Sequence, residues 1–179
     1  MSFLFSFLLL LIPNADKSEK NQSIIIKSAE TTVEQKGIRR VASSSVIAKI
    51  PKEKIWKILT SYDNMDEFLP SVNKSKLISR SGNKVVVDYS LNIAWQELRF
   101  LQECTELNNN QFLTFKTIDG DLKNYEGSWS LTETSEGTVI KYFVSVDYDS
   151  VLPDWMINQL MKSGITYLVE LIAVKASEV

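Results

Sequence analysis

The sequence predicts an α+β domain in which a curved antiparallel sheet wraps around one long C-terminal helix. Between residues 85 and 146, apolar and polar residues alternate in five runs, as in strands with one buried and one solvated face. After Pro153, apolar residues follow helical spacing for about six turns. An amphipathic helix of that length can cover the buried face of the sheet, and two shorter helices are expected near the N-terminus.

The chain begins with a segment that has features of an export signal. Residues 3–12 are apolar except for Ser6, and this run is too short to span a bilayer, which takes about 20 apolar residues. It matches the apolar region of a signal peptide, and the small Ala15 suits a cleavage site. Two features weaken the match: no basic residue precedes the apolar run, and Pro13 lies close to the expected cleavage site after Ala15. A non-cleaved hydrophobic anchor or a disordered end therefore remains the alternative.

These features divide the chain into three expected parts. Residues 1–15 are a signal peptide or hydrophobic N-terminal segment, residues 16–23 are a polar linker, and residues 24–179 are the domain. Export would place the domain in the periplasm or another extracytoplasmic space. Without export the protein would be cytoplasmic.

The domain is expected to open with a hairpin made by residues 23–34 and 38–50. Pro51 suits a helix start, because its fixed φ fits the first helical position and its missing N–H is no loss there. Apolar residues then recur at helical spacing as far as Leu59. At residues 62–64, the sequence Tyr-Asp-Asn is interpreted as a helix end whose Asp and Asn bond the local backbone. A polar binding site is the alternative for these three residues.

Six more strands and one long helix are expected to follow. The strands are predicted at residues 73–80, 85–93, 97–104, 113–117, 124–131 and 140–147, separated by turns rich in Gly, Asn and Asp. A helix over residues 154–177 would be roughly 35 Å long, enough to cross a sheet. The order and lengths of these elements favour a helix-grip fold.

The composition excludes several kinds of site. The chain contains no histidine, which removes the commonest general base and the commonest metal ligand. The single cysteine, Cys104, cannot form an internal disulfide. The formal charge is −2 and no basic face is present, so nucleic acid is not an expected partner. No metal or other cofactor is expected either. The pair Arg39-Arg40 is interpreted as a solvated strand start rather than a phosphate site.

Several short motifs are typical of one superfamily. They are Ile50-Pro51, Ile55-Trp56, Leu59-Thr60, Tyr62-Asp63-Asn64, Phe68-Leu69-Pro70, Gly127-Ser128-Trp129 and Val151-Leu152-Pro153-Asp154-Trp155. Through them, residues 38–176 resemble the START-like (SRPBCC) superfamily of the polyketide cyclase/dehydrase and coenzyme-Q-binding type, which also includes the ribosome-association toxin. The resemblance implies a helix-grip fold with an apolar cavity between sheet and helix. Members bind lipids, quinones, polyketides or other apolar molecules there.

The candidate ligand-binding residues lie on the inward face of the predicted strands and of the last helix. Alternation directs large aromatic and several polar side chains inward. The set is Tyr89, Phe100, Gln102, Phe115, Thr117, Tyr125, Trp129 and Tyr142 on the strands, and Leu160, Gly164 and Leu168 on the helix. Side chains of a curved sheet often leave its interior partly unfilled, so a ligand cavity can result. Simple packing against the helix is the alternative for each residue.

Two features of this set bear on the ligand. Buried polar groups need partners, which here are one another, a water molecule, or an oxygen of a ligand such as a quinone carbonyl. Gly164 costs about 0.8–1.0 kcal/mol relative to Ala within a helix. It is expected either to allow close packing against the sheet or to make room for a ligand, on the inner face in both cases.

The sequence leaves three functions open. We expect the protein to bind or transport an apolar small molecule, a lipid or an isoprenoid quinone, with transient membrane contact. A polyketide cyclase/dehydratase-like enzyme is the first alternative. It would need an inward carboxylate, whereas alternation places Asp88, Glu103, Glu126 and Asp147 on the solvated face. An interaction protein like the ribosome-association toxin is the second, and the hydrophobic start and the mild charge speak against it.

Overall fold

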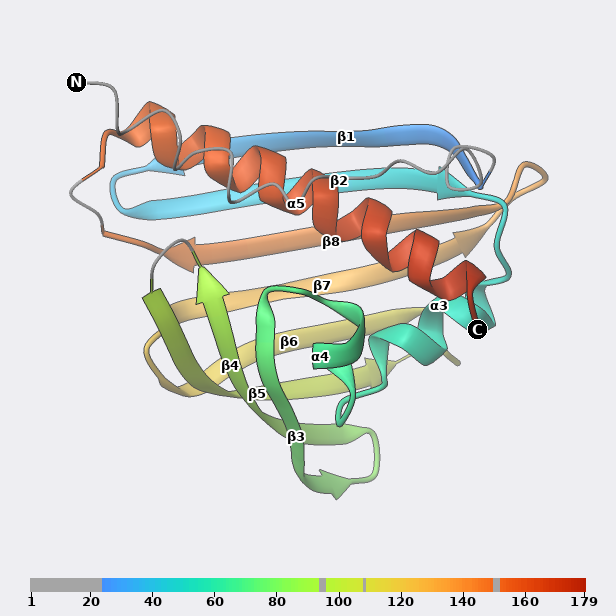
Figure 1. Ribbon diagram of the computed structural model, residues 1–179, viewed down its shortest axis with the longest axis horizontal. Coiled ribbons are helices and arrows are strands. Elements are labelled where there is room, and N and C mark those ends of the chain that lie inside the picture. Colours follow the sequence, from blue (N-terminus) through green and yellow to red (C-terminus); the bar gives the residue numbers. More distant parts are fainter. Residues whose placement is uncertain (1–23, 94–95, 108, 150–151) are drawn as a thin grey trace.

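The computed structural model describes residues 24–93, 96–107, 109–149 and 152–179 (Figure 1). The predicted signal peptide and linker lie outside the described residues, as does Val151 of the last motif. Within the described residues, eight antiparallel strands form one sheet in the order β1-β2-β8-β7-β6-β5-β4-β3. None of the described helices is long and apolar enough to cross a membrane.

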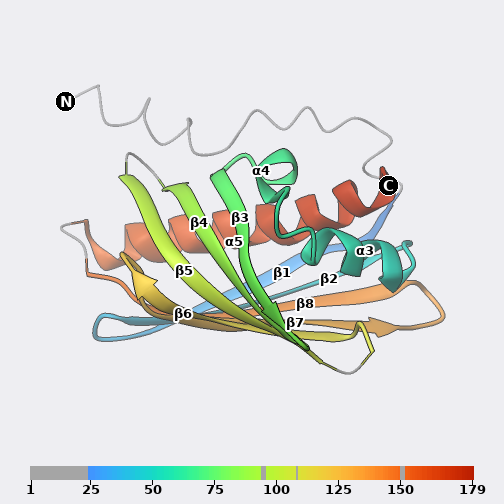
Figure 2. The ribbon, with the colours of Figure 1, turned by 90° about the horizontal axis from the view of Figure 1, so that it is seen from below.

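The elements follow the predicted order. The strands are β1 (Ile25–Lys36), β2 (Arg39–Ala48), β3 (Val72–Ser81), β4 (Lys84–Ile93), β5 (Gln96–Leu107), β6 (Phe112–Gly120), β7 (Lys123–Glu133) and β8 (Thr138–Asp147), and the helices are α3 (Lys52–Leu59), α4 (Met65–Phe68) and α5 (Asp154–Ser177). The sheet curls so that β3, β4 and β5 rise on the side where α5 lies (Figure 2). The predicted helix-grip fold is therefore confirmed.

Both main helices begin directly after a proline. Pro51 precedes α3 with φ −59°, and Pro153 precedes α5 with φ −57°. The buried face of α3 contains Ile55, Ile58 and Leu59, the residues whose spacing predicts this helix. The two helices pack against each other at the C-terminal end of α5, so they close one end of the curled sheet (Figure 1).

Helix α5 covers less of the sheet than its length suggests. Its backbone lies against β1 and β2, meets β8 only at the margin, and makes few or no close approaches to β3 to β7 (Figures 1 and 2). The inner face of β2 presents small buried residues, Ala42, Ser44 and Ala48, which let a helix approach closely. At the crossing, the Thr31 hydroxyl of β1 lies 2.7 Å from the Thr166 hydroxyl of α5. The size of the side chains thus decides which strands the helix covers.

A buried arginine ties β2 to the start of α5, so the interpretation of Arg39-Arg40 as a solvated strand start is wrong for Arg40. Only 2% of Arg40 is exposed. Its guanidinium donates to the Tyr148 carbonyl at 2.5 Å and to Asp154 Oδ1 at 2.7 Å. Alternation along β2 turns Arg40 inward, beside Ala42, where carbonyl groups and a carboxylate receive its charge. Arg39 points outward instead.

The connection after α3 also differs from its interpretation as a helix end with local side-chain bonds. Asp63 Oδ1 accepts the backbone N–H of Leu77 in β3 at 2.8 Å, which is a contact between distant segments. Asn64 precedes α4 without a side-chain capping bond. Tyr62 is buried, with 4% of its surface exposed. The helix thus ends before this segment as predicted, and the segment is held both by hydrogen bonds of its own backbone and, through Asp63, by β3.

Two glycines have opposite surroundings. A Cβ added to Gly127 in β7 would collide with the Phe143 carbonyl oxygen and with the ring of Phe115, which lies over this glycine. This contact explains the Gly in the Gly-x-Trp motif. A Cβ added to Gly164 in α5 would meet no atom within 4 Å, and the residue is exposed. The close-packing interpretation of Gly164 is therefore wrong.

These surroundings predict opposite stability changes for the same substitution. Gly164→Ala should raise the free energy of unfolding by about 0.5–1 kcal/mol, because Ala favours the helix and nothing obstructs its methyl group. Gly127→Ala should lower it by about 1–3 kcal/mol, because the strand and the Phe115 ring must shift. Urea unfolding of the two variants beside the unmodified protein measures both changes. Two changes of the same sign would contradict the surroundings described above.

Candidate ligand-binding site

The six aromatic side chains predicted to face inward form one continuous chain of ring contacts. In order they are Tyr89, Phe100, Tyr125, Phe115, Tyr142 and Trp129, on strands β4 to β8. Successive ring centroids are 5.7, 5.8, 5.3, 6.0 and 4.3 Å apart. Tyr125 is half-buried, and the other five rings are buried. Five consecutive strands thus combine their rings into one aromatic wall, and these six residues keep that name below.

The aromatic wall lies beside α5 rather than under it. The helix backbone runs over β1 and β2, whereas the wall belongs to β4 to β8. From α5, the side chains of Met161, Ile165 and Leu168 reach the core and pack against it. Leu160 is half-buried outside that core, and Gly164 is exposed with open space around it. Of the predicted helix residues, Leu168 is the one that the structure brings into the core.

Polar atoms of the predicted set lie among the rings. The hydroxyl groups of Tyr125 and Tyr142 are 3.3 Å apart. Gln102 Nε2 donates to Cys104 Sγ at 3.2 Å, and sulfur is a weak acceptor. The buried Thr117 Oγ1 has no hydrogen-bond partner among the described residues. The inner face of the sheet therefore carries, among and beside the rings of the aromatic wall, polar groups whose hydrogen-bonding capacity is only partly used.

The tyrosines of the aromatic wall and the neighbouring Cys104 remain neutral because they are buried. Burial raises the pKa of Tyr89, Tyr125 and Tyr142 above the ordinary tyrosine value, so each phenol keeps its proton. Burial also raises the pKa of the Cys104 thiol to about 11, which suppresses the nucleophilic thiolate near neutral pH. The wall presents uncharged hydroxyl and amide groups in an apolar setting.

A polar cluster that the sequence pattern did not predict lies at the C-terminal end of β5. Glu106 Oε1 accepts hydrogen bonds from the Tyr62 hydroxyl at 3.0 Å and from Arg80 at 2.9 Å. The Arg80 guanidinium lies 5.7 Å from the centre of the Tyr62 ring. Extending the alternation of β5 by two residues beyond Cys104 would have placed Glu106 on the inner face. Its partners could not be found that way, because they come from distant segments.

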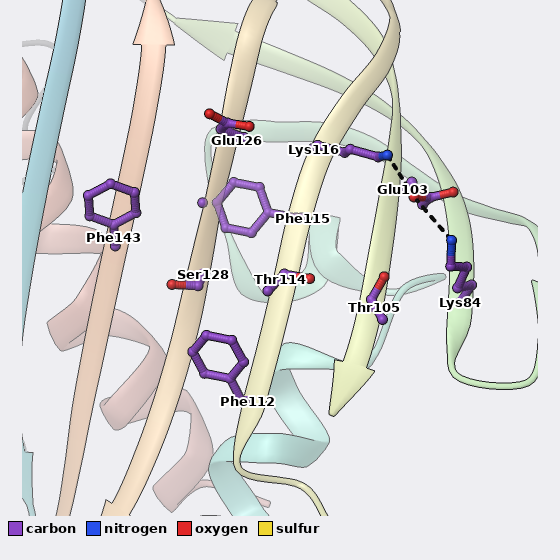
Figure 3. A pocket seen from close by; sticks show the side chains of 11 residues that line it. Lys84, Glu103, Thr105, Phe112, Thr114, Phe115, Lys116, Glu126, Ser128 and Phe143 are labelled. Atoms are coloured by element: carbon purple, nitrogen blue, oxygen red, sulfur yellow. Dashed lines mark ion pairs between the residues drawn. The ribbon is translucent and has the colours of Figure 1, made fainter. Parts of the chain in front are cut away.

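Two pockets lie outside the space between sheet and helix. One, of about 520 Å³, opens on the outer face of β4 to β8 between Phe112, Phe143 and charged side chains (Figure 3). The other, of about 370 Å³, lies beside Trp56 and Glu106. Of the eleven predicted lining residues, only Phe115 borders either pocket. The cavity between sheet and helix stays a prediction.

Carboxylates of the outer face take part in ion pairs. Asp88 pairs with Lys74 at 2.6 Å, and Glu103 pairs with Lys116 at 3.1 Å (Figure 3). Glu126 and Asp147 both pair with Arg39, at 2.9 and 3.1 Å. Within the part of the chain that the structure describes, Cys, Asp and Glu side chains form no group of three or more suited to a metal ion.

A curved antiparallel sheet that grips a C-terminal helix, with aromatic rings on its inner face, defines a START-like protein. The chain belongs to the polyketide cyclase / dehydrase and lipid transport family, which matches residues 48–170. This match confirms the resemblance noted in the sequence.

Individual relatives are similar over most of the chain. Ribosome association toxin RatA of Escherichia coli is 20% identical over 138 residues, which are 76% of this chain and 87% of the toxin. A START superfamily protein from Mycobacterium smegmatis has a TM-score of 0.68 at 15% identity, covering 77% of this chain and 97% of its own. A STAR-related lipid transfer protein from Xanthomonas axonopodis has a TM-score of 0.67 at 15% identity, covering 84% and 97%. At these identities the two structures show a shared fold.

The buried phenols predict a loss of stability in alkali. Burial raises the pKa of Tyr62, Tyr89, Tyr125 and Tyr142 in the folded protein, whereas the unfolded chain ionises near the ordinary value of about 10. Their contribution is therefore constant below about pH 10 and is lost above it, by up to about 1.4 kcal/mol per pH unit for each phenol. Urea unfolding between about pH 8 and about pH 11 measures the slope.

The control for this slope is Tyr142→Phe, which keeps the ring and removes one phenol. Its stability should fall less steeply with pH, by up to about 1.4 kcal/mol per pH unit. Tyrosinate absorbance that exceeds the signal of two of the six tyrosines while the protein stays folded would show that these phenols are accessible, and would refute the assignment.

Proposed function

We propose that this protein binds and transports an apolar small molecule, a lipid or an isoprenoid quinone, between the aromatic wall and α5. The observation that carries the proposal is the unbroken aromatic wall on strands that α5 does not cover. A family described by lipid transport as well as by cyclase activity supports it.

The chemistry of the wall suits an apolar ligand. Aromatic faces offer broad contact at little cost in side-chain freedom, and burying apolar surface contributes about 25 cal/mol per Å². The ligand would enter along the flank of α5 where Leu160 and Gly164 lie, since the helix leaves that side of the sheet free. Separation of rings and helix side chains would admit it, and transient contact with a membrane would supply it.

Export remains part of this proposal. A signal peptide at residues 1–15 would place the carrier outside the cytoplasm, where an apolar molecule needs a protein to cross water between membranes. The ligand class does not depend on this placement, because the aromatic wall is built by residues of the domain alone.

An enzymatic role receives less support. A cyclase or dehydratase would need an acid or base facing the ligand. Glu106 is an inner-face carboxylate, but its oxygen is bound to Tyr62 and Arg80 at one end of β5. The outer-face carboxylates are engaged in ion pairs. The described residues thus favour a carrier over a catalyst.

An interaction protein is the second candidate, favoured by the 20% identity to a ribosome association toxin. The outer pocket would be its contact surface, with Phe143, 42% exposed, on one side and the charged Lys84, Glu103 and Lys116 on the other (Figure 3). Cosedimentation with ribosomes that is lost in Phe143→Ala would favour this role. Protein that remains in the supernatant with intact fold would remove it.

The carrier proposal predicts a ligand that copurifies and can be exchanged. Organic extraction followed by mass spectrometry should recover a lipid or quinone from the purified protein, and the emptied protein should rebind it. Phe100→Leu removes a central ring of the wall, one that packs between Tyr89 and Tyr125 and would contact the ligand. It should weaken binding about three- to tenfold, since an aromatic contact with a ligand contributes about 0.5–1.5 kcal/mol. Titration of intrinsic fluorescence measures the affinity.

The matched control is Phe143→Leu, the same substitution on the opposite face of the sheet. Its affinity should equal that of the unmodified protein. If the protein releases no apolar molecule and binds none of a panel of lipids and quinones, the carrier function is wrong. Equal losses in both variants would move the site away from the aromatic wall.

A further inference from the structure

We infer that Thr117 and Gln102 together bind an uncharged carbonyl oxygen of the ligand, so that the carrier selects a neutral, carbonyl-bearing apolar molecule over an anionic lipid. The inference rests on the proposed function and deepens it, because it names the part of the ligand that the wall recognises.

The Thr117 hydroxyl is the first observation. Its oxygen is buried, yet it has no hydrogen-bond partner among the described residues. Buried polar groups are nearly always bonded, so an unpartnered hydroxyl in a predicted binding wall indicates a group that the ligand completes. Thr117 extends the inward-facing row of Leu113 and Phe115 along β6, which places it among the aromatic rings.

Gln102 supplies a second donor beside it. The register of β5 and β6 pairs Gln102 directly with Thr117. The Gln102 amide donates to Cys104 Sγ at 3.2 Å, and this bond to sulfur is easily exchanged for one to oxygen. A carbonyl oxygen accepts two hydrogen bonds, so it can receive the Thr117 hydroxyl and the Gln102 amide together.

The surroundings exclude an anionic group at this position. A buried carboxylate or phosphate requires a cation or several strong donors to replace its water. Arg40 and Arg80 lie at strand ends, and each is already paired with a carboxylate, at 2.7 and 2.9 Å. Lys116, next to Thr117 in the chain, points to the outer face and pairs with Glu103 (Figure 3). The inward-facing neighbours of the two donors are uncharged instead. Phe100 precedes Gln102 along β5, and Phe115 precedes Thr117 along β6. Val87 of β4 lies opposite Gln102.

Three probes with alkyl tails of nearly equal length separate the chemistries: decylbenzoquinone, decylbenzene and decanoate. The unmodified full-length protein should bind the quinone about tenfold more tightly than decylbenzene, and decanoate most weakly. Thr117→Val replaces the hydroxyl with a methyl group of the same shape. It should weaken quinone binding about tenfold, which is about 1.4 kcal/mol, and leave decylbenzene binding unchanged. The melting temperature of ligand-free Thr117→Val should equal or exceed that of the unmodified protein, because an unpaired hydroxyl is removed.

Two further variants make the result specific. Thr117→Ser keeps the hydroxyl and should retain the quinone preference. Thr114→Val makes the same change on the outer face of β6 and should alter no affinity. A quinone preference that survives Thr117→Val, or tighter binding of decanoate than of the quinone, overturns the inference and leaves the carrier function standing. Failure of all three probes to bind overturns the carrier function itself.

Discussion

The close approach of α5 to the small side chains of β1 and β2 is the constraint on which the rest of the structure depends. Small facing residues let a helix come near a sheet, and on the inner face of β2 three of the four buried residues from 42 to 48 are small, Ala42, Ser44 and Ala48, with Val46 between them. The large rings of β4 to β8 would hold the helix away. With α5 placed on one side, those rings are left to contact one another, so the core divides into a tightly packed edge and an aromatic region.

The arginine tie at one end and the helix contact at the other hold this arrangement in place. Arg40 joins β2 to the first turn of α5 through Asp154, while α3 packs against the C-terminal half of α5. A helix held at both ends keeps its position, while the side of α5 that carries Leu160 and Gly164 is not packed against the sheet. In such a geometry, the middle of a helix can shift to admit a ligand while both helix ends stay attached to the rest of the domain.

Local patterns predicted the elements, and long-range contacts decided what those patterns could not. Alternation assigned the inward rings correctly, because period two depends on the strand alone. Strands β4 to β8 are consecutive in both the sequence and the sheet, so the rings that they direct inward lie on neighbouring strands and form one wall. The position of α5, the burial of Arg40 and the bond from Asp63 to Leu77 depend on side chains from distant segments. The lining of a cavity remains predicted, since alternation says which way a side chain points and not how much space remains.

The bond between Asp63 and the Leu77 amide has a consequence for how copies of this protein meet. Strand β3 is one of the two edges of the sheet, and an edge strand with free N–H groups invites pairing with a strand of another molecule. The Asp63 carboxylate occupies one of those donors and places a negative charge there. On the other edge, Glu170 of α5 accepts the Ala29 amide of β1 at 3.1 Å. Acidic side chains at both edges therefore discourage open-ended strand addition.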